Sequence, residues 1–539
     1  MQSTLADLTQ ELTISLYLKR DVHENGMTLE EYTNEVIAGT QPTLDNDEYV
    51  YQFGALSDQL ALVENWARAN SLLIVESDLG IATVKVTGSI EQFNNLFKIQ
   101  LLSVTDDTRT YITHENEITI PSEINSVIAN VLGFENSIQF GSRIKGLDIS
   151  TLKADPTPAP NAFPNKFPVT PIQVATAYEV PPGNGYGQTI AIIEFQGSGW
   201  NQTDVNRTFA QVNLSPPAVT NYSVNGATFT TVSDVETMMD IYCAGAVAPK
   251  AKIVVYYAPP TSQGFYDMVL AIANDNVNRP SVLTISWGSS GDMNDYLAAA
   301  FQACITKGIL VFNSSGDDGG NNWQAEYPAS SRYVIAAGGT SIYLNSNNTY
   351  NAETVWSGSG GGISTYNSRP TWQTTPPIYY RTYSKTGVLG ASTLVFNRGV
   401  PDISAPADPY TGYTFYVNGS LNQNGGTSAA APFLAGMFAR LNQLLGRRIQ
   451  FGEIMNLLYG TAGITRDVTV GYNNYSWHGL GSVNGYAATP GWDAATGLGS
   501  PIASMIYKLL HNGTTFPKLN YGFRPTSGTT FPRRTTGVR

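Results

Sequence analysis

Histidine is the residue type whose scarcity excludes most in this chain of 539 residues. The four histidines are His23, His114, His478 and His511, so none lies between residues 115 and 477. The pattern His-Glu-x-x-His is absent, which excludes a zincin-type metalloprotease. A serine hydrolase with a histidine base would depend on a late histidine such as His478, and no matching aspartate–histidine block accompanies it.

Cysteine and charge are scarce as well. The two cysteines, Cys243 and Cys304, cannot form a disulfide framework or a four-cysteine zinc site, so we expect two buried thiols rather than a single bridge. Only 13% of the residues are charged, and 30 basic against 42 acidic residues give a net charge of −12. Nucleic acid is therefore not expected as a partner, because phosphate binding needs a concentrated basic face.

Long apolar runs are absent too. No run reaches the roughly 18 residues that cross a membrane, so no transmembrane span is predicted. The N-terminus lacks a basic stretch followed by an apolar one, so no secretory signal is visible. A hydrophobic fraction of 42% still indicates a folded protein. The length predicts two to four domains at about 150 residues each.

The N-terminal part of the chain alternates short strand and helix patterns. Residues 11–18 alternate apolar and polar side chains, as a half-buried strand does, and Ser89 with Gln92 makes a capping box before a short helix. The predicted elements are strands over 11–18, 71–76 and 81–88 and helices over 28–38, 56–70 and 89–97. The order β-α-β-β-α-β predicts a small α+β domain of the ferredoxin-like type.

A proline-rich stretch, residues 154–170, marks the clearest boundary, and we expect it to be extended, exposed and easily cut. Beyond it, short apolar runs alternate with helical segments, which is typical of βαβ units and a parallel sheet covered on both faces. The runs lie at 189–195, 252–258, 281–288, 308–316 and 333–339, with helices at 234–247 and 296–307. Residues 513–539 contain basic but no acidic residues and are expected to form a flexible tail.

The segment GGTSAAAP at 425–432 could carry chemistry. Its tight turn places Ser428 at the start of a helix, where backbone N–H groups and the helix dipole stabilise an anionic intermediate. Serine is also an ordinary helix cap, so this segment alone leaves both interpretations open.

Three carboxyl groups are the other candidates. Glu236 and Asp240 are four residues apart, on one face of a predicted apolar helix, where two buried carboxylates would titrate as a coupled pair. The alternative is a solvated acidic face. Asp317 lies in the loop NSSGDDGG after a buried strand, at the sheet edge where catalytic groups gather. An ordinary turn or a cation-binding loop would also fit Asp317.

These segments, in their order, resemble the sedolisins, serine-carboxyl peptidases that have a subtilisin-like fold and no catalytic histidine. The resemblance spans nearly the whole chain. It rests on IAIIEF (190–195), AGAVAPKAKIVVYYAP (244–259), TISWG (284–288), SSGDDG (314–319), YPASSRYVIAAGGTSI (327–342), WSGSGGGISTYNSRPTWQ (356–373), RGVPDISAPADP (398–409) and GGTSAAAP (425–432). Before the proline-rich stretch, VTGSIEQFNNLF resembles the activation-domain helix of the same family.

The resemblance implies an α/β fold, a subtilisin-like parallel sheet with flanking helices, preceded by an α+β ferredoxin-like prodomain. It implies that Ser428 is the nucleophile, Glu236 its general base and Asp240 the group that orients and tunes Glu236. Asp317 would be a protonated oxyanion donor beside the Ser428 amide, and Glu194 would extend the acid network. A carboxylate base and a protonated donor both predict an optimum of roughly pH 3–5.

The resemblance also implies a cleft that holds extended substrate. Its edges would be Ser286, Trp287 and Gly288 on one side and Gly361, within the run 360–362, on the other, because glycine permits close backbone approach. For Trp287, core packing is an equal alternative.

Segments 466–471 and 488–501 resemble the calcium loop of the family. One structural Ca²⁺ would be bound by the carboxylates of Asp467 and Asp493 and by backbone carbonyls. The carbonyl ligands would come from Val468, Thr489 and Gly491. Thr489 stands where a glycine is common, a change that a carbonyl ligand tolerates.

The chain is accordingly interpreted as a self-processing proenzyme. Residues 1–153 would be the activation prodomain and intramolecular inhibitor, 154–170 the linker with the cleavage region, 171–512 the peptidase and 513–539 the tail. The expected reaction is hydrolysis of peptides or unfolded proteins through an acyl-enzyme, by endopeptidase or tripeptidyl-peptidase action. The family implies an extracellular or acidic compartment, although no signal peptide is visible.

Two rival interpretations come from other classes. A catalytically inactive, peptide-binding relative would keep the fold and lose the chemistry. A glycosidase could use Glu236 and Asp240 as acid and nucleophile, but it would leave Ser428 and Asp317 unexplained.

Overall fold

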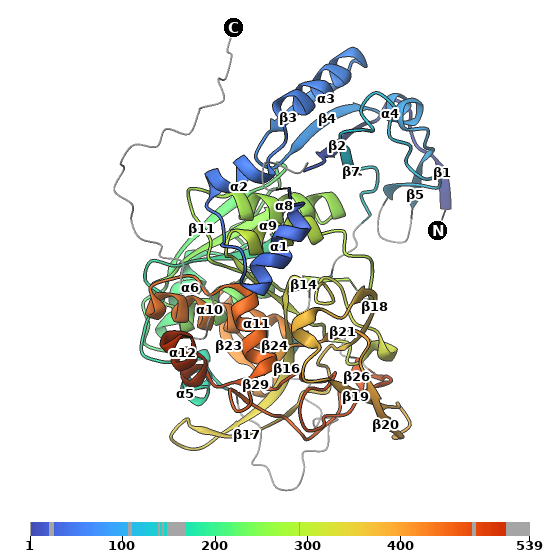
Figure 1. The fold of residues 1–539 in the computed structure, drawn as a ribbon. Helices are drawn as coiled ribbons and strands as arrows, with labels where there is room; N and C mark the ends of the chain where they lie inside the picture. The colour runs from blue at the N-terminus through green and yellow to red at the C-terminus, as the bar shows by residue number, and fades with distance from the viewer. Residues whose placement is uncertain are drawn as a thin grey trace.

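The computed structural model describes residues 2–20, 26–105, 110–137, 141–142, 145–147, 168–289, 291–476 and 481–513 (Figure 1). Most of the predicted cleavage region (through residue 167), His478 and the predicted tail after Gly513 lie outside the described residues. Two large hydrophobic cores are present, one in the N-terminal domain and one in the α/β part that follows.

The N-terminal domain contains the predicted ferredoxin-like unit. Its antiparallel sheet has the order β3-β4-β2-β7, and helices α3 and α4 connect the strands as β-α-β-β-α-β. The elements are β2 (Glu11–Leu18), α3 (Ser57–Ala69), β3 (Leu73–Asp78), β4 (Thr83–Ser89), α4 (Ile90–Phe97) and β7 (Ile128–Leu132). The capping box of Ser89 and Gln92 is formed at the start of α4, as predicted. A second small sheet joins β1 (Gln2–Leu5), β5 (Leu101–Thr105) and β6 (Thr110–His114).

Two further helices lie between β2 and α3, namely α1 (Leu29–Ala38) and α2 (Asn46–Phe53). The sequence predicted α1 but not α2, because α2 buries only Tyr49 and Phe53 and shows little apolar periodicity. The capping box of Asp45 and Glu48 was the signal that could have found it.

The α/β part is built on an eight-stranded sheet of order β11-β12-β10-β13-β15-β16-β17, with β22 also paired to β16. The strands are β10 (Thr189–Phe195), β11 (Ala218–Ser223), β12 (Lys252–Ala258), β13 (Val282–Ile285), β15 (Leu310–Ser314), β16 (Ile335–Leu344), β17 (Tyr350–Val355) and β22 (Ile403–Pro406). All pairs are parallel except β16 with β17. The five predicted strands are confirmed, and their carboxyl ends lie at one edge of the sheet.

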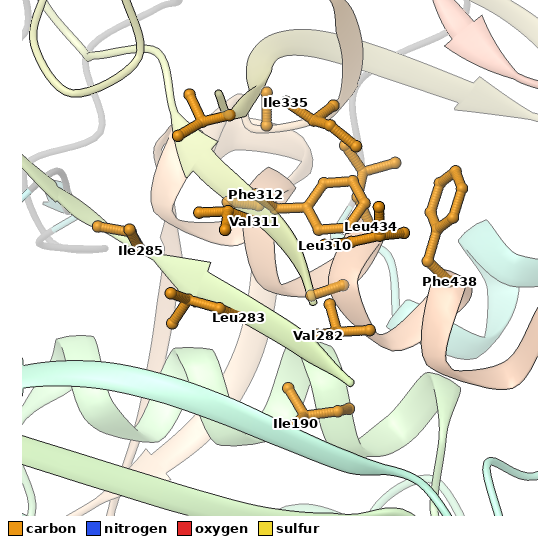
Figure 2. Packing of buried hydrophobic residues seen from close by; sticks show 14 of the residues in the cluster. Ile190, Val282, Leu283, Ile285, Leu310, Val311, Phe312, Ile335, Leu434 and Phe438 are labelled. Atoms are coloured by element: carbon orange, nitrogen blue, oxygen red, sulfur yellow. The ribbon is translucent and has the colours of Figure 1, made fainter. Parts of the chain in front are cut away.

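Helices flank this sheet and complete the subtilisin-like architecture. They are α5 (Pro171–Ala177), α6 (Gln202–Ala210), α7 (Val235–Val247), α8 (Ser262–Asn274), α9 (Ala298–Thr306), α10 (Thr427–Leu445), α11 (Phe451–Gly460) and α12 (Ala503–Asn512). Helix α10 lies against the central strands, and Phe312 of β15 packs on Phe438 of α10 with ring centroids 5.1 Å apart (Figure 2). Burying each such side chain contributes roughly 1.5–3 kcal/mol.

Short strands form the remaining pairings around the sheet. Two of these sheets have three strands. One has the order β23 (Tyr413–Val417), β24 (Ser420–Gly425), β9 (Lys145–Leu147), and the other the order β20 (Leu389–Leu394), β19 (Tyr379–Tyr383), β28 (Gly485–Tyr486). The two-stranded pairs are β14 (Trp287–Gly288) with β8 (Gly141–Ser142), β18 (Gly362–Ser368) with β21 (Asn397–Val400), β25 (Thr465–Arg466) with β29 (Ser500–Pro501), and β26 (Tyr475–Ser476) with β27 (Gly481–Ser482).

Cys243 and Cys304 are both free and buried, as predicted. Among the described helices, none is long and apolar enough to cross a bilayer.

Candidate active site

Ser428 is the second residue of α10 and lies in its first helical turn. Gly426 is the N-cap residue, with a φ of +103° that favours glycine. Ser428 is therefore not the cap, so the ordinary capping role that the sequence left open does not apply. Its side chain is fully buried, and its Oγ donates a 3.3 Å hydrogen bond to the backbone oxygen of Ser286. The hydroxyl stands at the positive end of the α10 dipole.

Glu236 and Asp240 lie on α7 and are both buried, as predicted, with exposed fractions of 4% and 0%. This burial excludes the solvated acidic face. The Oγ of Ser286 donates a 2.8 Å hydrogen bond to Oδ1 of Asp240. Ser286 thus contacts Asp240 with its side chain and Ser428 with its backbone, where α7 and α10 pack together.

Glu194 ends strand β10 within the same cluster. It is fully buried, and Trp287 donates its Nε1–H to Oε2 of Glu194 at 3.2 Å. No other described group bonds to Oε1 of this carboxyl. The Trp287 ring also packs edge-on against Phe195 at 5.0 Å, so this side chain combines packing with hydrogen bonding.

Burial and the charges of neighbouring carboxyl groups raise the pKa values of Glu194 and Asp240. Burial is the main cause for Glu194, and the charges of Asp234, Asp240 and Glu236 raise its pKa further. Burial also raises the pKa of Asp240 well above its usual range, although the Ser286 hydrogen bond lowers it. Such a cluster keeps protons at a pH where isolated carboxyl groups lose them. It can both accept and supply protons in acid.

Asp234 belongs to this cluster, and the sequence analysis did not find it. It is the N-cap of α7, where its carboxylate accepts hydrogen bonds from the backbone and hydroxyl of Thr237 at 2.9 and 2.8 Å. It also accepts from the backbone N–H of Gly199, at 2.5 Å, in the loop after β10. The signal in the sequence was the cap pattern Asp-x-x-Thr, two residues before Glu236.

Asp317 lies in the loop after β15, against the start of α10. Its Oδ1 accepts hydrogen bonds from the backbone N–H and the hydroxyl of Thr427, at 2.8 and 2.9 Å. Because Thr427 directly precedes Ser428, these bonds hold the carboxyl group next to the serine. Gly316 has a φ of +115°, and a Cβ there would lie 2.3 Å from the carboxylate of Glu326, so the loop requires glycine.

The predicted cleft edge at 286–288 is a paired strand in the structure. In β14, Trp287 pairs with Ser142 and Gly288 with Gly141, in antiparallel register. Likewise, β9 pairs with β24, whose last residue directly precedes the Gly426 turn. The chain that leaves the N-terminal domain therefore occupies the edges of two strands that adjoin the site, one directly after Ser286 and one directly before Gly426.

Gly361, predicted at the opposite edge, is buried close to other backbone. A Cβ at this position would lie 2.1 Å from the carbonyl oxygen of Ala494. The neighbouring Gly360 donates its N–H to the oxygen of Gly316 at 2.7 Å. The glycine run thus supports the loop that carries Asp317, and contact of Gly361 with substrate stays a prediction.

Asp467 and Asp493, the predicted calcium ligands, lie close together away from this cluster. The backbone N–H of Gly491 donates to Asp467 at 2.7 Å, and that of Thr489 donates to Asp493 at 2.9 Å. Burial raises the pKa of Asp493 to about 7, and the charge of Asp467 contributes to the rise.

The donor set at this pair of carboxylates fits a hard cation. No described donor bonds to the carbonyl oxygens of Val468, Thr489 or Gly491. Nowhere among the described residues do three His, Cys, Asp or Glu side chains converge on a metal site. Two carboxylates supplemented by carbonyl oxygens are a set that suits Ca²⁺.

Comparisons with known proteins agree with this geometry. The family model described as "Subtilase family" matches residues 230–499, which hold all four predicted catalytic residues. The model described as "Pro-kumamolisin, activation domain" matches residues 2–137.

Individual relatives extend the match over most of the chain. Kumamolisin of Bacillus sp. (strain MN-32) is 31% identical over 93% of this chain and 92% of its own length. Sedolisin of Pseudomonas sp. (strain 101) is 25% identical over 87% and 82% of the two chains. The structure of Pseudomonas sedolisin complexed with two molecules of pseudo-iodotyrostatin aligns with a TM-score of 0.52 at 25% identity, over 65% of this chain and 99% of that one. The chain therefore belongs to the sedolisin family of serine-carboxyl peptidases, and it carries the activation domain of a proenzyme.

Proposed function

We propose that this peptidase cleaves peptide bonds in acid with a Ser428–Glu236–Asp240 triad, and that Asp317 stabilises the oxyanion. The observation that carries the proposal is the contact of Ser286 with both Asp240 and Ser428. In addition, the bond from Thr427 to Asp317 holds that carboxyl group next to Ser428. A histidine is not needed, because buried carboxyl groups supply the proton acceptor and the hydrogen-bond donor.

The residues support a two-step acyl transfer. Ser428 Oγ attacks the scissile carbonyl while its proton passes to Glu236, and the oxyanion accepts hydrogen bonds from protonated Asp317 and the Ser428 amide. When the tetrahedral intermediate collapses, Glu236 returns the proton to the leaving amine and the acyl-enzyme remains. Water then attacks the ester with Glu236 again as base, which releases the acid product and restores Ser428.

Acid activity follows from this division of roles. Asp317 can donate to an oxyanion only while it is protonated, and a carboxylate base works best near its own pKa. The raised pKa values of Glu194 and Asp240 support a cluster that still holds protons in mild acid. A rate that is unchanged between pH 4 and pH 7.5 would contradict the mechanism.

We also propose that the proenzyme processes itself, with the first cut in residues 154–170. Strands β8 and β9 support an inhibited state, because they occupy the edges on which substrate would pair. Acid would loosen this state where carboxylates hold the two domains together. Asp267 of α8 is one such group, since it pairs with Lys85 of β4 at 3.4 Å and accepts from Tyr17 of β2 at 2.6 Å.

Asp467 and Asp493 would hold one structural Ca²⁺, with carbonyl ligands from Val468, Thr489 and Gly491. The ion would offset the repulsion between two carboxylates of which one is fully buried. It takes no part in the chemical steps.

The test is a shift of purified proenzyme from pH 7.5 to pH 4, read by gel, N-terminal sequencing and digestion of a denatured protein. We expect loss of about 160 N-terminal residues together with the onset of proteolysis. Ser428→Ala should stay full length and fail to react with an active-site serine probe. Processing of pure Ser428→Ala would show that another protease makes the cut. Parallel substrates with free and blocked N-termini distinguish tripeptidyl-peptidase from endopeptidase action.

A further inference from the structure

Helices α1 and α2 of the prodomain pack in the core of the peptidase and not in the core of their own domain. We call residues 28–53, which comprise both helices, the arm. Its buried side chains join the same hydrophobic cluster as the peptidase sheet: Leu29, Tyr32, Val36, Ile37, Leu44, Tyr49 and Phe53. The ferredoxin-like unit has a separate core, formed by residues such as Val63, Trp66, Phe93 and Phe97. Figure 1 shows α1 (blue) between α9 (green) and α11 (orange).

The closest contact joins α1 to the start of α11. A Cβ on Gly452 would lie 1.9 Å from the carbonyl oxygen of Ile37, so the two backbones touch with no space for a methyl group. Gly452 lies in the first turn of α11, and its φ is not in the left-handed region. The glycine is therefore required by the arm and not by the conformation of α11 itself.

Polar groups fix the arm on the end of α9. The N–H of Leu44 donates to the oxygen of Thr306 at 2.8 Å, and the hydroxyl groups of Thr33 and Thr306 are 3.0 Å apart. Lys307 donates to Asn46 at 2.7 Å. These bonds satisfy backbone and side-chain groups at the carboxyl end of α9, which would otherwise need water.

Strands β8 and β9, near the carboxyl end of the prodomain, hold it to the peptidase much less extensively. Strands β8 and β9 together contain five residues, and in the described part of the chain they pair with β14 and β24 beside the active site. A cut within residues 154–170 removes the covalent connection between these strands and the peptidase and leaves the arm in place.

We infer that the arm is the anchor that keeps the prodomain bound to the peptidase after the linker is cut. Clearing the active site and losing the prodomain are then separate steps, and the second requires α1 to leave α9 and α11. The role of the arm in activation rests on the proposed self-processing of the proenzyme. The binding of the arm to the peptidase does not depend on the catalytic chemistry.

The test uses the full chain with Ser428→Ala and a recognition site for a sequence-specific protease placed within residues 154–170. After cutting at pH 7.5, size-exclusion chromatography over a dilution series measures how much prodomain stays with the peptidase. Two substitutions probe the arm, Gly452→Ala on the peptidase and Val36→Ala on the arm. The matched controls are Gly460→Ala, on the same helix with open space around its Cβ, and Asn34→Ala, exposed on α1.

We expect the unsubstituted fragment and both controls to stay bound. Gly452→Ala and Val36→Ala should each weaken binding at least about tenfold, because overpacking and cavity formation both disrupt a packed interface. A single cooperative melting transition before cutting verifies that each variant folds. If Gly452→Ala does not fold, the test rests on Val36→Ala alone. Immediate separation of the unsubstituted fragment, or unchanged binding of both arm variants, would overturn the inference. Because an added protease makes the cut, failure of self-processing leaves this test intact.

Discussion

The side chain of Ser286 donates a 2.8 Å hydrogen bond to Asp240, although the two residues are 46 positions apart in the chain. This bond lowers a pKa that burial has raised. Ser286→Ala should therefore raise the pKa of Asp240 further and leave its Oδ1 buried without this donor, at a cost of about 1–3 kcal/mol. We expect kcat to fall about tenfold or more and the acid limb of the kcat/KM profile to move to higher pH.

Ser330→Ala is the matched control for this substitution. Ser330 is equally buried, and its hydroxyl has no hydrogen-bond partner among the described residues. It should leave the pH profile unchanged. An identical profile for Ser286→Ala would show that Ser286 does not tune the carboxyl cluster.

Asp317 can be tested with an alanine and an asparagine. Asp317→Ala removes the oxyanion donor, and we expect kcat to fall by about 10²–10³. Asp317→Asn keeps an acceptor for the two bonds from Thr427 and supplies an N–H donor that does not titrate. Its activity should therefore exceed that of the alanine variant and decline less between pH 5 and pH 7 than that of the wild type. Measured pH–rate profiles decide this, and a steeper decline for asparagine would contradict a protonated donor.

The ion pair of Asp267 and Lys85 links the two domains where both side chains are nearly buried. Asp267→Asn removes the negative charge, and loss of a charged hydrogen bond costs about 1.5–3 kcal/mol. The proenzyme should then begin processing at a higher pH, which a pH series read by gel measures. Glu64→Gln, which removes the more exposed pair with Arg68 within α3, should leave the onset unchanged. The same onset for Asp267→Asn and wild type would exclude this ion pair as a trigger.

Calcium should change how stability depends on pH. Without the ion, Asp493 has a pKa of about 7 in the folded chain, above its ordinary value of 3.8. Its contribution to stability is thus complete below pH 3.8 and is lost as the pH rises towards 7. Melting of Ser428→Ala with a chelator at pH 7 should show a decrease of several degrees that added Ca²⁺ restores.

The variants at this site separate calcium binding from general effects of charge. Asp467→Asn should abolish the response to Ca²⁺, whereas Asp58→Asn, on the exposed start of α3, should keep it. A melting temperature that does not respond to chelation at pH 7 would mean that no calcium is bound.

Local patterns were sufficient for most of the fold. The strand at 189–195 and the helix that carries Glu236 and Asp240 follow from runs of apolar residues whose period and length are local properties. Helix α2 was missed because only two of its side chains are buried, so its sequence shows no clear apolar periodicity. The comparisons confirm the family that the ordered motifs indicated.

The sequence by itself determined which residue types stand at 428, 236, 240 and 317 and on which kind of element each lies. Only the tertiary structure showed that Ser286 connects Asp240 to Ser428, that Asp234 joins the carboxyl cluster and that the arm of the prodomain packs on α11. These relationships join segments tens to hundreds of residues apart. Nothing in a local pattern fixes such distances, because they arise only when packed elements bring separate parts of the chain together.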